Sequence, residues 1–205
     1  VGRDLRAFGG WSPASLFADG TQGAWLDLTA PHRLYQMAVG GLPVTGTGDP
    51  IGRIEDAGPY GHHAVQFTSS SRPTWGTEGA GTGWAQLDGI DDNLQVPLPD
   101  GNYSVVQGTR EGYLEYGIAV SGGKGWSVLQ SPNYLPVNSL THLVVYEGTT
   151  KGSEVKHQLS QTLLQLPTAM SNAFRDRRDL TTLDVSNWDT SSVTAFNSFA
   201  YGASS

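Results

Sequence analysis

Short stretches in which apolar and polar residues alternate recur along most of this chain, with turn residues between them about every ten positions. A period of two is typical of a β-strand with one buried and one exposed face. The turns are rich in glycine, which makes up 27 of the 205 residues. The pattern predicts a mainly β protein of short antiparallel strands. The stretches that carry it are residues 63–68, 84–89, 93–99, 113–120, 125–130 and 141–148.

Strands of this number and spacing predict an antiparallel β-sandwich over residues 16–150. Residues 1–15 have no clear period, so we expect an arm or linker there. The loop SGGKG, residues 121–125, predicts a hairpin that joins the strands on either side of it.

The pattern changes after Gly152. Apolar residues then recur every three or four positions, which predicts a helix over residues 153–166, with Ser153 as its cap and Pro167 at its end. We therefore place a domain boundary at residues 149–153, with a separate region over 151–205. The apolar residues of the helical stripe are Val155, Leu159, Leu163 and Leu166.

Two related segments follow, TAMSNAF (168–174) and TAFNSFA (194–200), at an offset of 26 residues. An offset of this size is typical of a solenoid, in which each coil of chain stacks on the one before it. In the stretch LTTLDVSNW we expect Leu183 and Val185 to point inward from a short strand and Trp188 to fill the turn after it. One coil cannot bury its own apolar side. We therefore expect the sandwich, a partner chain or a further part of a longer protein to cover it, and favour the last.

The composition limits the possible partners. The net charge is −7, whereas grip on a phosphate backbone needs clustered basic residues, so no nucleic-acid partner is expected. The one basic cluster, Arg175, Arg177 and Arg178, is interleaved with aspartates and is interpreted as a solvated face. With no cysteine, disulfides, cysteine-ligated zinc and a thiol nucleophile are excluded. No apolar run approaches the roughly 20 residues of a membrane span, so no membrane insertion is expected, and no signal peptide is visible.

Candidate sites for chemistry are few, and the sequence assigns no catalytic, cofactor-binding or metal-ligating residue. Asp88, Asp91 and Asp92 offer carboxylate oxygens of the kind that calcium prefers, but a turn between strands explains them as well. His62 and His63 would face opposite ways in a strand, so they cannot easily share one ion.

Sugar chemistry offers two further sets of residues. Aromatic side chains near the expected loops would stack on sugars if they are exposed, or fill a small core if they are not. Glycoside hydrolysis needs two carboxylates across a cleft. The aromatic candidates are Tyr103, Tyr113, Trp126 and Tyr134, and the carboxylate candidates are Glu55, Glu78, Glu111 and Glu115.

The stretch LTTLDVSNWDTSSVTAFNSF closely resembles the leucine-rich repeat of BspA-like surface proteins, a resemblance that covers residues 166–205. It implies adhesion or display. Where that repeat usually has a cysteine before its Ser-Ser pair, this chain has Ala203.

A second resemblance covers residues 15–98. The blocks SLFADGTQGAWLDLTAPHRLYQ, PVTGTGDPIGRIEDAGPYGHHAVQ, SRPTW and AQLDGIDDNLQVP look, in this order, like the opening of concanavalin-like (laminin-G-like) domains in tail and fibre proteins of tailed bacteriophages and their prophages. This resemblance implies a β-sandwich in a virion surface protein.

The two resemblances lead to one expected function. We expect a non-enzymatic virion structural protein, a tail-tip, fibre or spike component that attaches to a glycan or receptor on the host surface. Its partners would be other virion proteins and copies of itself, as in a trimer, and it would lie on the particle surface, outside the cell. The alternatives are a bacterial cell-surface adhesin and a glycan-degrading enzyme.

Overall fold

The computed structural model describes residues 13–29, 31–79, 82–110, 112–129, 139–148, 164–166 and 168–203. The protein is mainly β and its large sheets are antiparallel, as the sequence predicts. The described helices are short 3-10 turns, and none of them is long enough to cross a bilayer. They are η2 (Pro13–Phe17), η3 (Pro31–Arg33) and η4 (Ser69–Ser71).

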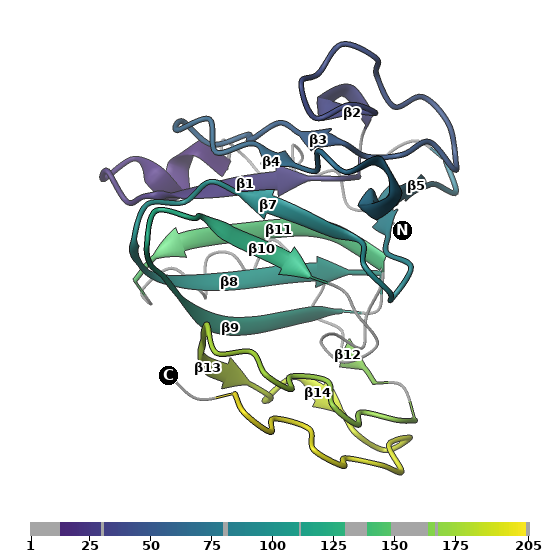
Figure 1. Ribbon diagram of the computed structural model, residues 1–205, viewed down its shortest axis with the longest axis vertical. Helices are drawn as coiled ribbons and strands as arrows, with labels where there is room; N and C mark the ends of the chain where they lie inside the picture. The colour runs from purple at the N-terminus through teal and green to yellow at the C-terminus, as the bar shows by residue number, and fades with distance from the viewer. Residues whose placement is uncertain are drawn as a thin grey trace.

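The larger sheet has seven strands in the order β13-β9-β8-β11-β6-β5, with β1 paired to β11 beside β6 (Figure 1). The chain enters it near the start, at β1, and returns to its edge near the end, at β13. The strands are β1 (Gly23–Asp27), β5 (Thr74–Gly76), β6 (Trp84–Gln86), β8 (Gly101–Thr109), β9 (Tyr113–Val120), β11 (Ser139–Glu147) and β13 (Leu180–Asp184).

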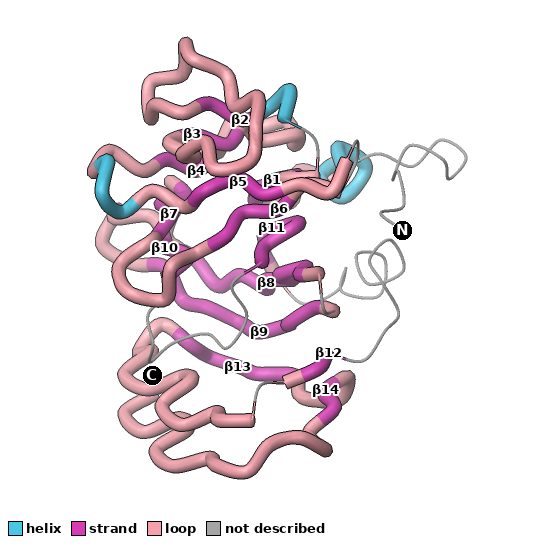
Figure 2. Tube along the Cα trace, turned by 90° about the vertical axis from the view of Figure 1, so that its right-hand side faces the viewer, coloured by secondary structure: helices cyan, strands magenta, loops and turns pink. Residues whose placement is uncertain are grey.

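The second sheet has five shorter strands in the order β10-β7-β4-β3-β2. It lies against one face of the seven-stranded sheet, so the two form layers (Figure 2). The main apolar core fills the space between them and takes Leu94 and Ile54 from one layer and Val105 and Leu143 from the other. The strands are β2 (Leu34–Tyr35), β3 (Arg53–Ile54), β4 (Ala64–Val65), β7 (Asn93–Val96) and β10 (Trp126–Leu129).

The middle of the larger sheet is buried on both faces. In β11, Leu143 faces the main core, whereas Val144 and Tyr146 face a second cluster on the outer side of the sheet. Leu16 and Phe17 of η2 belong to this second cluster. Burial of both faces explains why β11 has an apolar run without alternation, from Leu143 to Tyr146.

The structure confirms strands in all six predicted stretches but corrects one connection. Residues 121–125 do not form a hairpin, because β9 and β10 belong to different sheets. Trp126 pairs with Val96 of β7 instead. The loop therefore crosses between the layers, and the carboxylate of Asp100 accepts hydrogen bonds from the backbone N–H groups of Gly122 and Gly123 at 2.9 and 2.8 Å.

After the sheets, the chain forms two stacked coils. We call residues 164–166 and 168–179 the inner coil and residues 180–203 the outer coil. The strands β12 (Leu164–Gln165) and β14 (Trp188–Asp189) pair in parallel, and Ala169 bridges Ala195 in parallel at the predicted offset of 26. Most of the predicted helix, residues 153–163, lies outside the described residues. Where that prediction extends to Leu164 and Gln165 it is wrong, because these residues form a strand.

The outer coil is joined to the larger sheet through β13. Leu183 lies opposite Tyr116 and Asp184 opposite Glu115, so β13 extends the sheet beyond its edge strand β9 (Figure 1). Leu183 and Trp188 are half-buried and pack against the main core. Val185, expected to point inward, is 52% exposed. It follows the last β13 residue that pairs with β9, and so lies beyond the cover of the sheet.

The two coils differ in burial. Apart from the exposed Ala169, the described apolar residues of the inner coil belong to the main core, whereas no residue of 180–203 is fully buried. The inner coil thus contributes to the core, and the outer coil covers it and faces the solvent. The buried residues of the inner coil are Leu164, Leu166, Met170, Ala173 and Phe174.

Candidate attachment surface

The outer coil presents a surface rich in hydroxyl and amide groups. These side chains both donate and accept hydrogen bonds, as the hydroxyl groups of a sugar do. Two exposed aromatic rings lie among them, Phe196 at 46% exposure and Tyr201 at 68%. The exposed polar residues are Thr181, Thr182, Ser186, Thr190, Ser191, Ser192, Thr194, Asn197 and Ser198.

The only charged residues of the outer coil are Asp184 and Asp189. Each carboxylate accepts a hydrogen bond, at 2.9 Å, from the backbone N–H two residues later, at Ser186 and Ser191. Both aspartates therefore shape turns of the coil. The outer coil itself has no basic residue, but the exposed Arg175 guanidinium of the inner coil lies 5.7 Å from the centroid of the Tyr201 ring.

A buried ion pair holds the inner coil to the two sheets. The Arg177 guanidinium donates to both carboxylate oxygens of Asp179, each at 2.8 Å, and only 4% of Arg177 is exposed. The indole N–H of Trp126, on β10, donates to the same carboxylate at 3.2 Å. The Asp179 carbonyl accepts from the Ala119 N–H of β9 at 2.8 Å. Asp179 thus connects the coil to a strand of each sheet.

The electrostatics of this joint follow from its burial. Burial alone would raise the pKa of the Asp179 carboxyl, but hydrogen bonds and the charge of Arg177 hold that pKa below its ordinary value. Burial also raises the pKa of the Tyr116 hydroxyl, which donates to Gln107 Oε1 at 3.2 Å. Arg177 and Asp179 are therefore both charged at neutral pH, and their ion pair fixes the position of the inner coil.

This joint corrects the interpretation of the basic cluster. Arg178 and Arg175 are exposed, as a solvated face requires, but Arg177 is buried. The spacing Arg-x-Asp at residues 177–179 is too common to predict an ion pair by itself. The side chain that makes it a site, Trp126, lies 53 residues away along the chain.

The three aspartates of the calcium candidate form a turn. Asp88 Oδ1 accepts from the N–H groups of Ile90, Asp91 and Asp92, and Asp92 Oδ2 accepts from the Asp88 N–H at 2.8 Å. The Asp91 carboxylate accepts from Ser71 Oγ at 2.7 Å. The backbone hydrogen bond from Ile90 contributes most to lowering the pKa of Asp88, whereas burial raises the pKa of Asp92. Among the described residues, no group of His, Cys, Asp and Glu is placed to hold a metal ion.

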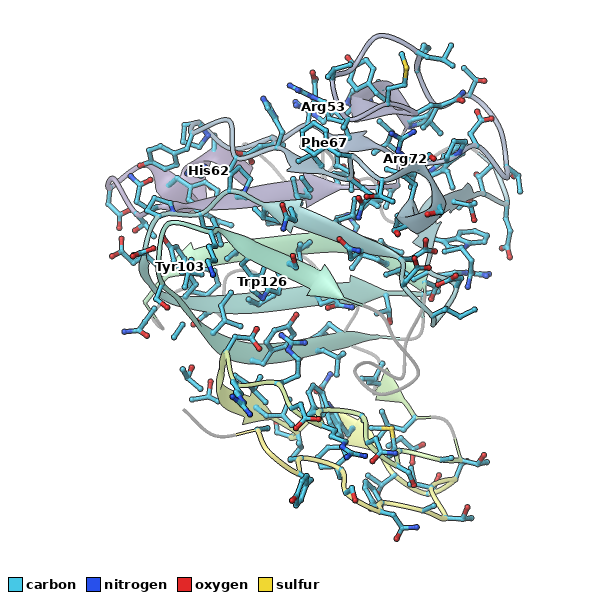
Figure 3. The ribbon with its side chains drawn as sticks, in the orientation of Figure 1. Arg53, His62, Phe67, Arg72, Tyr103 and Trp126 are labelled. Carbon is cyan, nitrogen blue, oxygen red and sulfur yellow. The ribbon has the colours of Figure 1, made fainter. Side chains whose placement is uncertain are left out.

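His62 and His63 lie in the loop before β4, around the buried carboxylate of Asp56. That carboxylate accepts from the N–H groups of Trp25, Gly58 and His62. His63 Nδ1 accepts from the Asp56 N–H at 3.0 Å, and burial lowers the pKa of His63. The two histidines do not share a ligand position: His63 holds the loop, and the His62 ring lies 5.9 Å from that of Tyr60 (Figure 3).

The described aromatic candidates contribute to the core. The Tyr103 hydroxyl donates to the Pro99 carbonyl at 3.0 Å, and Trp126 packs 6.3 Å from the Tyr116 ring (Figure 3). Tyr113 is half-buried against the second cluster. Tyr134 lies outside the described residues. The exposed rings of Phe196 and Tyr201 were not among the candidates, although the offset of 26 that places them on the outer coil was visible in the sequence.

The three described glutamate candidates lie on different elements of the fold. Glu55 lies 4.0 Å from Arg53, and Glu78 forms an ion pair with Arg110. Glu115 is on β9, opposite Asp184 in the register. The fourth candidate, Glu111, lies outside the described residues.

A second exposed apolar group lies at the other end of the molecule. Arg72 donates to the Gln36 carbonyl at 3.1 Å and to the Phe67 carbonyl at 3.2 Å, which ties two loops together (Figure 3). The exposed apolar side chains on these loops are Met37, Val39, Leu42 and Phe67.

Comparison with known proteins adds no family to this description: no family model matches the chain, and neither a curated protein nor a solved structure is detectably similar to it.

Proposed function

We propose that the chain is a non-enzymatic structural protein of a tailed bacteriophage or a related particle, a tail-tip, fibre or spike component that attaches to a glycan or receptor on the host surface. In this proposal the two packed sheets are a short concanavalin-like sandwich, and the coils are the start of a BspA-like leucine-rich-repeat solenoid. The protein would lie on the particle surface, outside the cell.

One observation carries the proposal. The outer coil presents hydroxyl and amide groups with two exposed aromatic rings, and it is fixed to a rigid base by β13 and by the buried pair of Arg177 and Asp179. A surface held in this way loses little conformational freedom when it binds. Such a surface suits recognition better than catalysis, which needs convergent reactive groups.

Weak individual sites would act together in the assembled particle. Several copies, for example a trimer, would present several outer coils at once and raise the apparent affinity without any new contact. The proposal therefore includes other virion proteins and further copies of this chain as partners, and a host-surface glycan or receptor as the ligand.

The test is to locate the chain on purified particles with a specific antibody and to measure binding of the protein to host cells. We expect label at the tail, and we expect the Tyr201→Ser variant to bind host cells less well than the wild type. Phe67→Ser, which removes an exposed ring at the opposite end, is the matched control and should bind normally. Label on the bacterial envelope would identify a cell-surface adhesin instead, and a free cytoplasmic monomer would refute the proposal.

A further inference from the structure

One row of side chains crosses the whole five-stranded sheet on the face that points away from the core. Neighbouring strands of this sheet are antiparallel, and residues directly opposite one another on such strands point to the same face. The members of this set, which we call the cross-strand row, lie opposite one another in succession from β2 to β10. They are Tyr35, Arg53, Val65, Gln95 and Ser127.

The burial pattern confirms the direction in which the row points. Each member has a sequence neighbour in the main core, as Leu34 is beside Tyr35 and Ile54 beside Arg53, whereas the members themselves are half-buried or exposed. The sheet lies in front of the larger one in Figure 1, so the row faces the viewer there. Since neighbouring strands are about 4.8 Å apart, the row extends over about 19 Å from β2 to β10.

Arg53 is the charged member of the row, and its guanidinium has no acceptor. The Arg53 side chain is only 24% exposed and its Nε is buried, yet no oxygen of the described residues accepts a hydrogen bond from it. The Glu55 carboxylate is 4.0 Å from Nη2, which is too far for a hydrogen bond. A partly desolvated donor without an acceptor costs free energy, so this guanidinium favours the arrival of an acceptor from outside the protein.

Arg72 shows how a structural arginine differs from Arg53. Both lie at the end of the molecule away from the coils (Figure 3). The Arg72 guanidinium donates to three backbone carbonyls at 3.0 to 3.2 Å, and so holds two loops together. No comparable contact in the described ranges explains the position of Arg53. Its donors are therefore free to bind a ligand.

The neutral members of the row add hydrogen-bonding groups and an apolar surface. Within the part of the chain that the structure describes, the side chains of Tyr35, Gln95 and Ser127 make no hydrogen bond. Hydroxyl and amide groups both donate and accept, as the hydroxyl groups of a sugar do. The Tyr35 ring and the Val65 side chain offer apolar surface for the C–H faces of a sugar ring. The row therefore combines the contacts that a sugar chain needs.

The charge of the site selects an acidic sugar with isolated negative charges. A guanidinium binds a carboxylate through two parallel N–H···O bonds. Glu55 lies close to Arg53 and the net charge of the chain is −7, so a single negative charge suits the site better than a polyanion. A peptide fits less well, because peptides that add to sheets pair their backbone with a strand edge, whereas this row offers side chains on a face.

We propose that the cross-strand row is a second binding site, for a short linear oligosaccharide that carries a carboxylate. The carboxylate accepts hydrogen bonds from Nε and Nη2 of Arg53. The sugar units on either side of it contact Tyr35 in one direction and Val65, Gln95 and Ser127 in the other. This inference goes beyond the attachment role of the outer coil and does not depend on it, because the row lies on a different sheet and the binding concerns the isolated protein.

The test is to titrate the protein with carboxylated tetrasaccharides and to follow its NMR spectrum. The probes are hyaluronan tetrasaccharide and tetragalacturonate, with the methyl ester of each as the uncharged control. We expect at least one acid to shift the signals of Tyr35, Val65 and Gln95. We expect its ester to bind about tenfold more weakly or worse, because the ester loses the charge-assisted hydrogen bonds.

Two variants separate a binding role of Arg53 from a structural one. Arg53→Gln should weaken binding of the acid by about tenfold or more. Its midpoint of urea unfolding should be no lower than that of the wild type, because no hydrogen bond within the described protein is lost. Arg178→Gln removes the same charge from an exposed position of the inner coil and should bind like the wild type.

Three results would overturn the proposal. They are unchanged row signals with both acids, equal affinity for acid and ester or equal weakening in the two variants, and a lowered urea midpoint of Arg53→Gln, which would make the guanidinium structural. The Tyr201→Ser variant should bind these sugars normally. Failure to find the chain on particles would leave the titrations unaffected, so the two proposals fail independently.

Discussion

Replacement of Asp179 by alanine should destabilise the protein far more than its partial exposure indicates. The change leaves the Arg177 guanidinium, 4% exposed, without either of its two hydrogen bonds to the carboxylate. Loss of one partner of a buried pair costs about 3–5 kcal/mol. The indole N–H of Trp126 also loses its acceptor, which adds about 1 kcal/mol or more.

Solvent reduces the summed energetic cost of Asp179→Ala. The Asp179 side chain is 30% exposed, so water enters the space that it vacates and hydrates part of the guanidinium. We therefore expect a loss of about 4 kcal/mol in the free energy of unfolding. For a chain of this size that corresponds to a fall in Tm of about 8–16 °C.

The assay is urea unfolding followed by tryptophan fluorescence and circular dichroism, with the same midpoint required from both probes. The double variant Arg177→Met with Asp179→Ala should be more stable than Asp179→Ala alone, because no unpaired buried charge remains. Arg178→Ala is the control: the exposed neighbour should change the free energy by less than about 0.5 kcal/mol. If Asp179→Ala is as stable as that control, the ion pair does not hold the inner coil to the sheets.

Three further predictions concern the edge, pH and calcium. Gly117→Val should raise hydrogen exchange in β13 while β8 stays protected, since a Cβ at Gly117 would meet the hydroxyls of Thr181 and Thr182; equal exchange in both strands would contradict this. Burial lowers the pKa of His142 in the folded protein. At pH values between this lowered pKa and the ordinary histidine pKa of about 6.5, the unfolded chain binds more protons than the folded one. The free energy of unfolding should therefore fall as the pH drops below about 6.5. Urea midpoints between pH 7 and 5 should therefore vary less in His142→Gln than in the wild type. Calcium in excess should leave the Tm unchanged, because the carboxylate of Asp88 binds backbone N–H groups; a rise in Tm would show a site.

The sequence predicted those parts of the fold that depend on local patterns. Alternation located strands such as Tyr113–Val120, with Tyr116 and Ile118 on the buried face. The offset of 26 located the contact between Ala169 and Ala195. Each of these depends only on residues near one another in sequence, or on two copies of one pattern.

Non-local pairing is what the sequence did not reveal. The hairpin expected at residues 121–125 does not form, because Trp126 pairs with Val96 of β7 in the other sheet. This pairing is non-local and does not depend on the sequence of the loop. β8, Gly101–Thr109, was missed because nearly all of its residues are buried, so it has no alternation to detect.

The candidate site was predictable in outline but not in its anchoring. The exposed Ser and Thr residues of the outer coil follow from the repeat, whereas the burial of Arg177 requires β9, β10 and the coil to meet. The pairing of β13 with β9 was likewise hidden, because β13 belongs to a segment that the sequence placed in a separate region.

Hydrogen exchange of the intact chain at β13 and β9 tests most directly whether the coils are a rigid extension of the sheet. We predict that amides bonded between Leu180–Asp184 and Tyr113–Val120 exchange as slowly as those of β8, because all belong to one sheet over one core. Exchange of the β13 amides at the rate of an unfolded chain, with β8 still protected, would contradict it.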